Sequence, residues 1–234
     1  MLEEGAPVVL VSREVAPLSR AVALATVLDD APTLLEQAVA VLRTWPPAAD
    51  LALAGVDDPA DLPVGLADRA LLTVSEQVLG VPLEHSVACD RCGELTTLTL
   101  ARDDIPEHHP PGALTGPGSR VREPTWRDLL ASGDDAVALL NRCTVTAGGT
   151  LEDLARVEGS LSGPLHAKCT GCGTHFELDV DVIELVLRAL GAVPADLDRD
   201  VHVLASRYGW DLAMIEALPD HRRRRLATLA WSLP

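Results

Sequence analysis

Lysine and aromatic residues are nearly missing from this chain of 234 residues. Lys168 is the single lysine, and one phenylalanine, one tyrosine and four tryptophans bring aromatics to 3% of the sequence. Leu, Val and Ala must therefore fill the core, and hydrophobic residues reach 47%. Arginine supplies nearly all positive charge, and the net charge of −16 argues against a general nucleic-acid binder, because phosphate contacts dominate that affinity.

The chain also lacks a run of about 20 uninterrupted apolar residues, so it predicts no membrane span. The first residues, Met1-Leu2-Glu3-Glu4, show no basic segment followed by an apolar one, as a secretory leader would. Five cysteines, four of them spaced as metal ligands, fit a reducing compartment. We therefore expect a cytoplasmic protein, with incorporation into a particle as a further possibility.

The motifs of common enzyme classes are missing as well. The sequence has no Gly-rich phosphate loop, no Gly-x-Ser-x-Gly elbow and no His-Glu-x-x-His pair. Acidic pairs such as Asp103-Asp104 and Asp134-Asp135 stand beside turn or helix-start residues, where solvated carboxylates are common. We expect no enzymatic activity, and keep a zinc- or thiol-dependent enzyme as a second alternative.

Two Cys-x-x-Cys pairs are the most informative feature that is present. Cys89 and Cys92 form the first pair, Cys169 and Cys172 the second, and a glycine follows each. Strand-like alternation leads away from both, so the segments resemble two copies of a strand–knuckle–strand unit. Four thiolates at this spacing suit one tetrahedral zinc ion. The sequence predicts a zinc ribbon, split by a long helical insert, with one structural zinc.

Other interpretations of these cysteines are weaker. A redox dithiol is expected as one motif beside a βαβ pattern, which the sequence does not show. His166 and His175 lie three residues from the second pair and could replace a cysteine ligand, although ordinary strand residues are the favoured interpretation. Cys143 ends an apolar helical run and is expected to be a small buried core residue.

Helix start and stop signals, turns and connector-like stretches divide the chain into three parts. Together they predict an α+β fold that is mostly helical. Residues 1–62 are an N-terminal, mostly helical segment and linker, with a strand at residues 7–11 and a connector at 48–63. Residues 63–180 hold the split ribbon and its helical insert, and residues 181–234 form a C-terminal helical cap. Thr33 and Thr125 begin helices as capping boxes. We expect Gly191 and Pro194 to end the helix that follows the ribbon.

The C-terminal part contains a cluster of basic residues, His221-Arg222-Arg223-Arg224-Arg225. The cluster is interpreted as a solvated helix start, with an acidic protein partner as the alternative. Trp210 and Trp231 are either packed or part of an exposed docking patch, and packing is the favoured interpretation. In the middle of the chain, His108-His109 falls in a proline-rich loop and is interpreted as solvated.

The order of these motifs resembles a family of bacterial and tailed-phage baseplate hub or tail assembly proteins. The resemblance runs from about residue 62 to the C-terminus, and residues 1–61 do not share it. The matching stretches are Leu62-Pro63-Val64-Gly65, Leu79-Gly80, both Cys-x-x-Cys-Gly motifs, Pro124-Thr125, Leu139-Leu140-Asn141-Arg142-Cys143, Phe176, the segment from Asp200 to Tyr208-Gly209-Trp210, and Ile215-Glu216-Ala217-Leu218-Pro219 before the arginines.

The resemblance implies a non-catalytic structural or assembly protein of the hub of a contractile phage tail or phage-derived injection system. Its partners would be baseplate hub, spike or tape-measure proteins, and no nucleic acid or membrane. A zinc-ribbon regulator that binds nucleic acid or polymerase is the main alternative. That alternative requires a basic surface around the knuckles, where only Arg91, Arg102 and Lys168 lie nearby.

Overall fold

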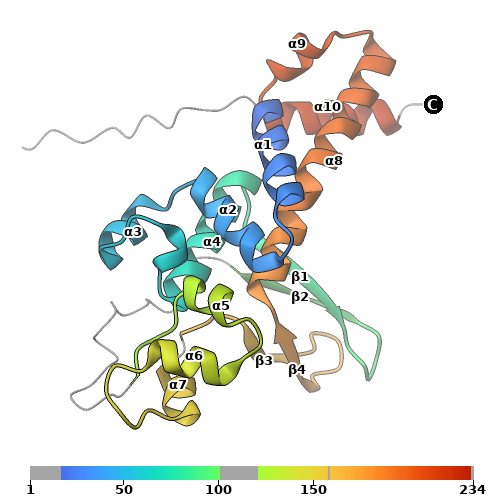
Figure 1. Ribbon diagram of the computed structural model, residues 1–234. Helices are drawn as coiled ribbons and strands as arrows, with labels where there is room; N and C mark the ends of the chain where they lie inside the picture. The colour runs from blue at the N-terminus through green and yellow to red at the C-terminus, as the bar shows by residue number, and fades with distance from the viewer. Residues whose placement is uncertain (1–16, 101–120, 158, 233–234) are drawn as a thin grey trace, which may run out of the picture. The chain divides into compact units, whose positions relative to one another are not determined.

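The structure is a computed structural model that describes residues 17–100, 121–157 and 159–232 (Figure 1). The helices are α1 (Pro17–Asp30), α2 (Leu34–Thr44), α3 (Ala48–Ala54), the 3-10 helix η1 (Pro59–Asp61), α4 (Val64–Leu79), α5 (Trp126–Ser132), α6 (Ala136–Cys143), α7 (Leu151–Val157), α8 (Val182–Tyr208), α9 (Leu212–Glu216) and α10 (Asp220–Ser232). The strands are β1 (Leu83–Ala88), β2 (Leu95–Leu100), β3 (Gly163–Lys168) and β4 (His175–Val180). The predicted α+β class, mostly helical with two hairpins, is confirmed.

The described residues fall into two compact units. One unit is Leu24–Val193, which contains both hairpins. The other is Pro194–Pro234 together with the described part of Met1–Ala23. The division falls within α8, at Pro194.

Capping boxes begin two helices of the larger unit, as the sequence predicts. Thr33 Oγ1 accepts from the amide of Glu36 at 3.2 Å, and the Glu36 carboxylate accepts from the Thr33 amide at 3.1 Å. Thr125 and Asp128 repeat this exchange at the start of α5, at 3.2 and 3.0 Å. Each box satisfies amides that have no partner within the first helical turn.

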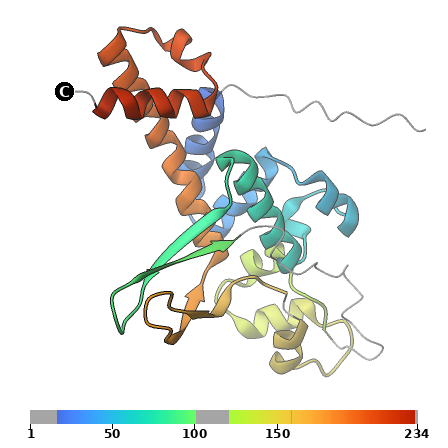
Figure 2. The same ribbon diagram turned by 180° about the vertical axis from the view of Figure 1, so that it is seen from behind.

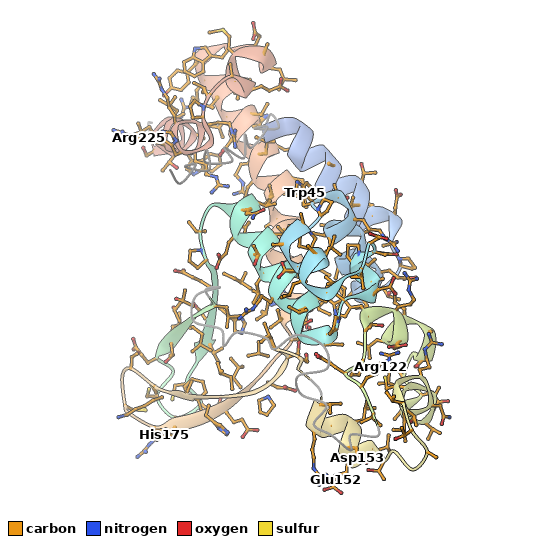
Figure 3. All side chains as sticks on the ribbon, turned by 90° about the vertical axis from the view of Figure 1, so that its left-hand side faces the viewer. Trp45, Arg122, Glu152, Asp153, His175 and Arg225 are labelled. Carbon is orange, nitrogen blue, oxygen red and sulfur yellow. The ribbon has the colours of Figure 1, made fainter. Side chains whose placement is uncertain are left out.

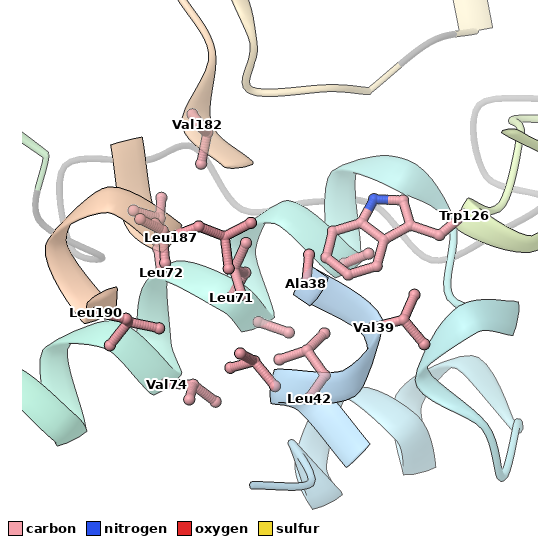
Figure 4. Packing of buried hydrophobic residues seen from close by; sticks show 14 of the residues in the cluster. Ala38, Val39, Leu42, Leu71, Leu72, Val74, Trp126, Val182, Leu187 and Leu190 are labelled. Atoms are coloured by element: carbon pink, nitrogen blue, oxygen red, sulfur yellow. The ribbon is translucent and has the colours of Figure 1, made fainter. Parts of the chain in front are cut away.

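The core of the larger unit forms around α4, whose apolar side chains meet those of α2 and of the first part of α8 (Figure 4). Trp126 is fully buried in this core and supplies the bulk that its small aliphatic residues lack. Leu83, where β1 begins, and Val180, where β4 ends, lie at the bases of the two hairpins and belong to the same core. The hairpins are therefore anchored at their bases by apolar packing and extend from it.

The start of α4 is tied to the segment that precedes α5. Pro63 and Thr125 form an isolated β-bridge, and the Val64 amide donates to the Pro124 carbonyl at 2.9 Å. The Gly65 amide donates to the Glu123 carboxylate, also at 2.9 Å. Backbone donors that the helix itself cannot satisfy are thus paired by a segment almost sixty residues away.

A buried carboxylate, Asp128, extends this junction to α6. Its side chain is 5% exposed and contacts Arg122 at 2.7 Å and Arg142 at 3.1 Å. Burial alone would raise the pKa of Asp128, but hydrogen bonds from Arg122 and Thr125 outweigh it and hold the pKa at about 2. Cys143, at the end of α6, is fully buried in a small cluster with Val121, as predicted for this cysteine.

Two sequence predictions are wrong at the element level. Residues 48–63, expected as a connector, form α3 and η1, and η1 begins at a side-chain cap from Asp58 to the Ala60 amide. The helix after the ribbon does not end at Gly191, because α8 continues through Pro194 to Tyr208. The predicted strand at residues 7–11 and the His108-His109 loop lie outside the described residues.

The smaller unit has its own core, between the last turns of α8 and helices α9 and α10. Leu204 and Ile215 are fully buried there, and half-buried Trp210 packs against them. Trp231 differs from the packing expected of it, since it is 73% exposed. Arg223 is the buried member of the arginine cluster and faces Asp200, with the nearest nitrogen and oxygen 3.4 Å apart.

Candidate metal centre

The two hairpins are copies of one unit, offset by 80 residues along the chain. Leu83 pairs with Leu100 and Ala88 with Leu95 in the first hairpin, and the second pairs the residues 80 positions later, from Gly163↔Val180 to Lys168↔His175. Six antiparallel pairs lead to each knuckle. The predicted strand–knuckle–strand repeat is confirmed, and both Cys-x-x-Cys pairs lie at the ends of their hairpins.

Each knuckle closes with the same hydrogen bonds. The Cys89 amide donates to the Glu94 carbonyl at 2.8 Å, and the Cys169 amide donates to the Thr174 carbonyl at 2.9 Å. The amide of each knuckle glycine donates to the carbonyl of the first cysteine of its pair, Gly93 to Cys89 at 2.8 Å and Gly173 to Cys169 at 3.0 Å. Both glycines adopt a left-handed φ, +73° and +71°, which a side chain would oppose. The turn therefore aims two sulfurs in one direction.

The knuckle ends of the two hairpins lie next to each other (Figures 1 and 2), and their four cysteine sulfurs form one cluster. All four Sγ atoms lie within 4.8 Å of one another. The Sγ atoms of Cys89 and Cys172 are 3.8 Å apart, and those of Cys92 and Cys169 are 3.6 Å apart. A tetrahedral site with Zn–S bonds of about 2.3 Å has sulfur–sulfur edges of about 3.8 Å. The cluster therefore fits a tetrahedral metal ion of this size.

Contacts between the knuckles follow the same pseudo-two-fold relation as the sulfurs. Arg91 donates from Nη1 to Thr174 Oγ1 at 3.1 Å. The equivalent contact on the other side joins Gly171 and Glu94: a Cβ added to Gly171 would meet the Glu94 side chain at 3.0 Å. Arg91 thus engages the ribbon itself. A side chain at position 171 would require the Glu94 side chain to shift by a few tenths of an ångström.

The electrostatics of the cluster favour a cation. The Thr174 hydroxyl lies 3.2 Å from the sulfur of Cys172, and hydrogen bonding from Thr174 lowers the pKa of that thiol to about 6. The Glu94 backbone favours ionisation of Cys92, but the neighbouring cysteine sulfurs outweigh it and raise its pKa to about 12. A backbone hydrogen bond from Cys172 also lowers the pKa of Cys169, so ionisation is favoured at both cysteines of the second pair and opposed at Cys92. A bound metal ion removes that opposition, since thiolates are the ligands it takes.

The two histidines near the second pair lie on strands, as the favoured interpretation predicts. His166 lies in β3 opposite Glu177 of β4, with His166 Nδ1 3.7 Å from the Glu177 carboxylate. His175 begins β4 opposite Lys168, at the outer end of its hairpin (Figure 3). Among the described residues, the metal-ligand cluster consists of the four cysteines alone.

A site of four sulfurs has a restricted chemistry. Four protein ligands close a tetrahedral ion and leave no position for water, as in structural zinc sites, whereas catalytic zinc keeps one position open. The cysteines are free thiols, and the sulfur distances of 3.6 and 3.8 Å exceed the roughly 2.05 Å of a disulfide. The arrangement suits a clamp between the two hairpins.

A buried aspartate on α4 is hydrogen-bonded to the segment that leads into β3 of the second hairpin. Asp68 is 1% exposed, and its Oδ2 accepts from the Ser160 hydroxyl and from the Leu161 amide, both at 2.9 Å. Burial raises the pKa of Asp68 to about 6. Its Oδ1 and the Trp126 indole nitrogen are both buried and neither has a hydrogen bond of normal geometry among the described residues, but Trp126 is near enough to Asp68 to oppose the rise in its pKa. Sequence reasoning missed this contact, although a carboxylate within the apolar stripe of α4 was visible.

Thr174 and Glu94 were also missed as contributors to the site. Both follow a knuckle glycine, and a comparison of the two copies position by position would have picked them out. Across the part of the chain that the structure describes, no helix combines the length and apolar character needed to cross a bilayer. No family model, no curated protein and no solved structure matches this chain.

Proposed function

We propose that this chain is a non-catalytic structural or assembly protein of the baseplate hub of a contractile tail, in a phage or a phage-derived injection system. One structural zinc ion, bound by Cys89, Cys92, Cys169 and Cys172, would hold its ribbon together. The single observation that carries the structural role is the sulfur-only cluster, with edges of 3.6 and 3.8 Å that match tetrahedral zinc.

The zinc ion would act as a cross-link. Its two ligand pairs come from separate two-stranded sheets, so that one ion ties residue 89 to residue 172 across the whole helical insert. In zinc-finger peptides such an ion contributes roughly 10–16 kcal/mol of apparent binding free energy, which becomes folding free energy. A tetrahedral set of four thiolates selects zinc or iron over the other common metal ions, and of these two we propose zinc.

The tail assignment rests on the resemblance of the motifs, and the positions of those motifs support it. Two matching stretches, at residues 62–65 and 124–125, meet at the start of α4. The third, at residues 139–143, contacts the neighbouring segment, where Arg142 pairs with Asp128 of α5. In the smaller unit, Asp200 faces Arg223 of the arginine-rich stretch, and Ile215 is fully buried. Residues shared with the family thus hold one fold together in each unit. That is what an architectural protein requires.

The nucleic-acid alternative finds less support. Arg91 donates to Thr174 between the knuckles, and Lys168 reaches back toward Gly173, with its Cε 3.6 Å from a Cβ built there. The Arg91 guanidinium is therefore hydrogen-bonded within the ribbon, and the stem of Lys168 lies along it. A surface that binds the phosphate backbone of a nucleic acid needs several lysines or arginines that face outward.

Co-purification from the native host tests the proposal. The tagged chain is isolated with its zinc, and its partners are identified by mass spectrometry. Recovery of hub, spike or tape-measure proteins, confirmed when a tagged hub protein retrieves this chain, is the expected result. Recovery of RNA polymerase or of salt-sensitive nucleic acid, without tail proteins, would overturn the tail assignment and favour the regulator.

A further inference from the structure

The smaller unit leaves its largest exposed aromatic side chain between two surface hollows. Trp231, near the end of α10, is 73% exposed in a chain with only four tryptophans. It lines a hollow of about 450 Å³ together with Arg199, Val203 and Thr228. It also lines a hollow of about 290 Å³ with His202, Ser206 and Arg207. We call Trp231 and these six residues the Trp231 face.

Cations border both hollows of the Trp231 face. Arg199 stands beside the larger hollow and Arg207 beside the smaller one, and both are exposed. Exposed Arg224 lies one helical turn before Thr228 and two turns before Trp231, so these three residues share one stripe of α10. The acid that lines the larger hollow, Asp200, faces buried Arg223, and Arg199 pairs with Asp196 at 3.0 Å, with both of these side chains more than half exposed. Because such an exposed ion pair is weak, Arg199 can exchange Asp196 for the carboxylate of a partner.

The charge of this region differs from that of the rest of the chain. Residues 194–234 contain six arginines and six carboxylates and are neutral, so residues 1–193 carry the entire net charge of −16. Charges are screened beyond about 8 Å at physiological ionic strength, so the local balance decides which partner can approach. An acidic partner would be repelled by most of the chain and accepted at the Trp231 face, which also sets its orientation.

We propose that the Trp231 face docks an acidic amphipathic segment of a partner protein. Apolar side chains of that segment would fill the hollows on either side of Trp231, and its carboxylates would meet Arg199, Arg207 and Arg224. Tryptophan and arginine are the residues most enriched among those that dominate binding energy at protein interfaces. This surface is inferred from the smaller unit alone and does not depend on the tail assignment or on the metal.

Site-specific photo-crosslinking in the native host tests this docking. The photoreactive amino acid p-benzoylphenylalanine replaces Thr228, which leaves Trp231 in place, and a matched control carries it at Val137, 60% exposed on α6. Crosslinked peptides are sequenced by mass spectrometry. The expected product at position 228 is one segment of a second protein with an excess of Asp and Glu and with apolar residues between them. The control should not capture that segment.

Two variants in the crosslinking background show which side chains hold the segment. Trp231→Ala and Arg224→Glu should each lower the yield about tenfold or more, while Arg224→Lys should retain most of it. The proposal is overturned by equal yields at positions 228 and 137, by a basic or uncharged segment, or by a nucleic-acid adduct. It is also overturned if the product is a second copy of this chain or the chain's own N-terminal residues.

Discussion

The five cysteines show how residue environment decides chemistry. Cys89 and Cys169 are buried at their knuckles, and Cys92 and Cys172 are exposed, yet all four sulfurs point into one cluster. Cys143 is fully buried among aliphatic side chains, and burial raises the pKa of its thiol. The same residue type therefore forms a cluster that could bind a metal ion at four positions and is a small apolar side chain at the fifth.

Replacing one ligand should release the metal. Cys172→Ser is expected to lower bound zinc below a tenth of an equivalent and to lower the melting temperature by about 10 °C or more, because the ion contributes folding free energy. Cys143→Ala is the matched control, and it should keep a full equivalent of zinc. Metal analysis and thermal unfolding of both proteins are the measurements. A Cys172→Ser protein with wild-type zinc content would remove this residue from the site.

Asp68 should make stability depend on pH in a direction opposite to most carboxylates. Because burial raises its pKa to about 6, the folded chain holds a proton between about pH 4 and pH 6 that the unfolded chain has lost. Its contribution therefore favours folding below about pH 4 and diminishes as pH rises to 6. Over this window the free energy of unfolding should fall by at most about 3 kcal/mol.

Asp68→Asn isolates this contribution. The amide oxygen can still accept from Leu161, but the side chain no longer titrates. The difference in unfolding free energy between variant and wild type, measured by denaturant titration at pH 5 and pH 7, should change in favour of the variant at pH 7. Metal loss at low pH affects both proteins alike. A difference that is constant with pH would show that Asp68 has an ordinary pKa.

At the scale of elements, the knuckles depend on backbone conformations that only glycine adopts without strain. A Cβ at Gly93 would meet nothing within 4 Å, so only its φ of +73° opposes a side chain. Gly191 is different, because it lies inside α8 and its Cβ would make an ordinary 3.8 Å contact with Leu28. The two glycines should respond to alanine in opposite directions.

Gly93→Ala should destabilise the protein by about 1–2 kcal/mol and weaken zinc binding, since a left-handed conformation costs an L-residue that much. Gly191→Ala should stabilise it by about 0.5–1 kcal/mol through helix propensity, with unchanged zinc affinity. Denaturant unfolding and competition with a zinc chelator measure both quantities. Equal effects at the two positions would contradict the knuckle geometry.

The junction at Asp128 predicts a second element-scale contrast. Asp128→Asn removes the charge that Arg122 and Arg142 share and should cost about 1–3 kcal/mol. Asp61→Asn weakens a pair with Arg127 in which both side chains are more than a third exposed, and it should cost less than about 1 kcal/mol. Denaturant unfolding of both variants at pH 7 provides the comparison. If Asp61→Asn lowered the free energy of unfolding more than Asp128→Asn does, the exposed pair would matter more than the buried carboxylate, and the prediction would be wrong.

Across the whole molecule, local patterns predicted well where one principle dominates. Thr33 and Thr125 begin helices because a capping box satisfies their first amides, and the repeat of Cys-x-x-Cys-Gly predicts two equal knuckles. The fold class followed from such local evidence. The cluster of four cysteines followed from spacing alone, and the structure brings these residues together.

The sequence could not reveal features that depend on distant packing. Pro194 removes one helical hydrogen bond, and local preference therefore predicted a helix end, but α8 continues because each of its halves has its own apolar neighbours. Asp68 finds its partners 92 and 93 residues away, at Ser160 and Leu161. Trp231 was expected to pack, and its exposure depends on how α10 is rotated.

The central claim is that one zinc ion joins the two half-ribbons. The most direct test is metal analysis of the full chain, purified without added metal and dialysed, together with an intact mass under denaturing conditions. The account predicts one equivalent of zinc per chain, no iron, and a mass with all five cysteines reduced. A zinc-free protein whose mass is lower by two hydrogen atoms per disulfide, or one that holds iron instead, would contradict it.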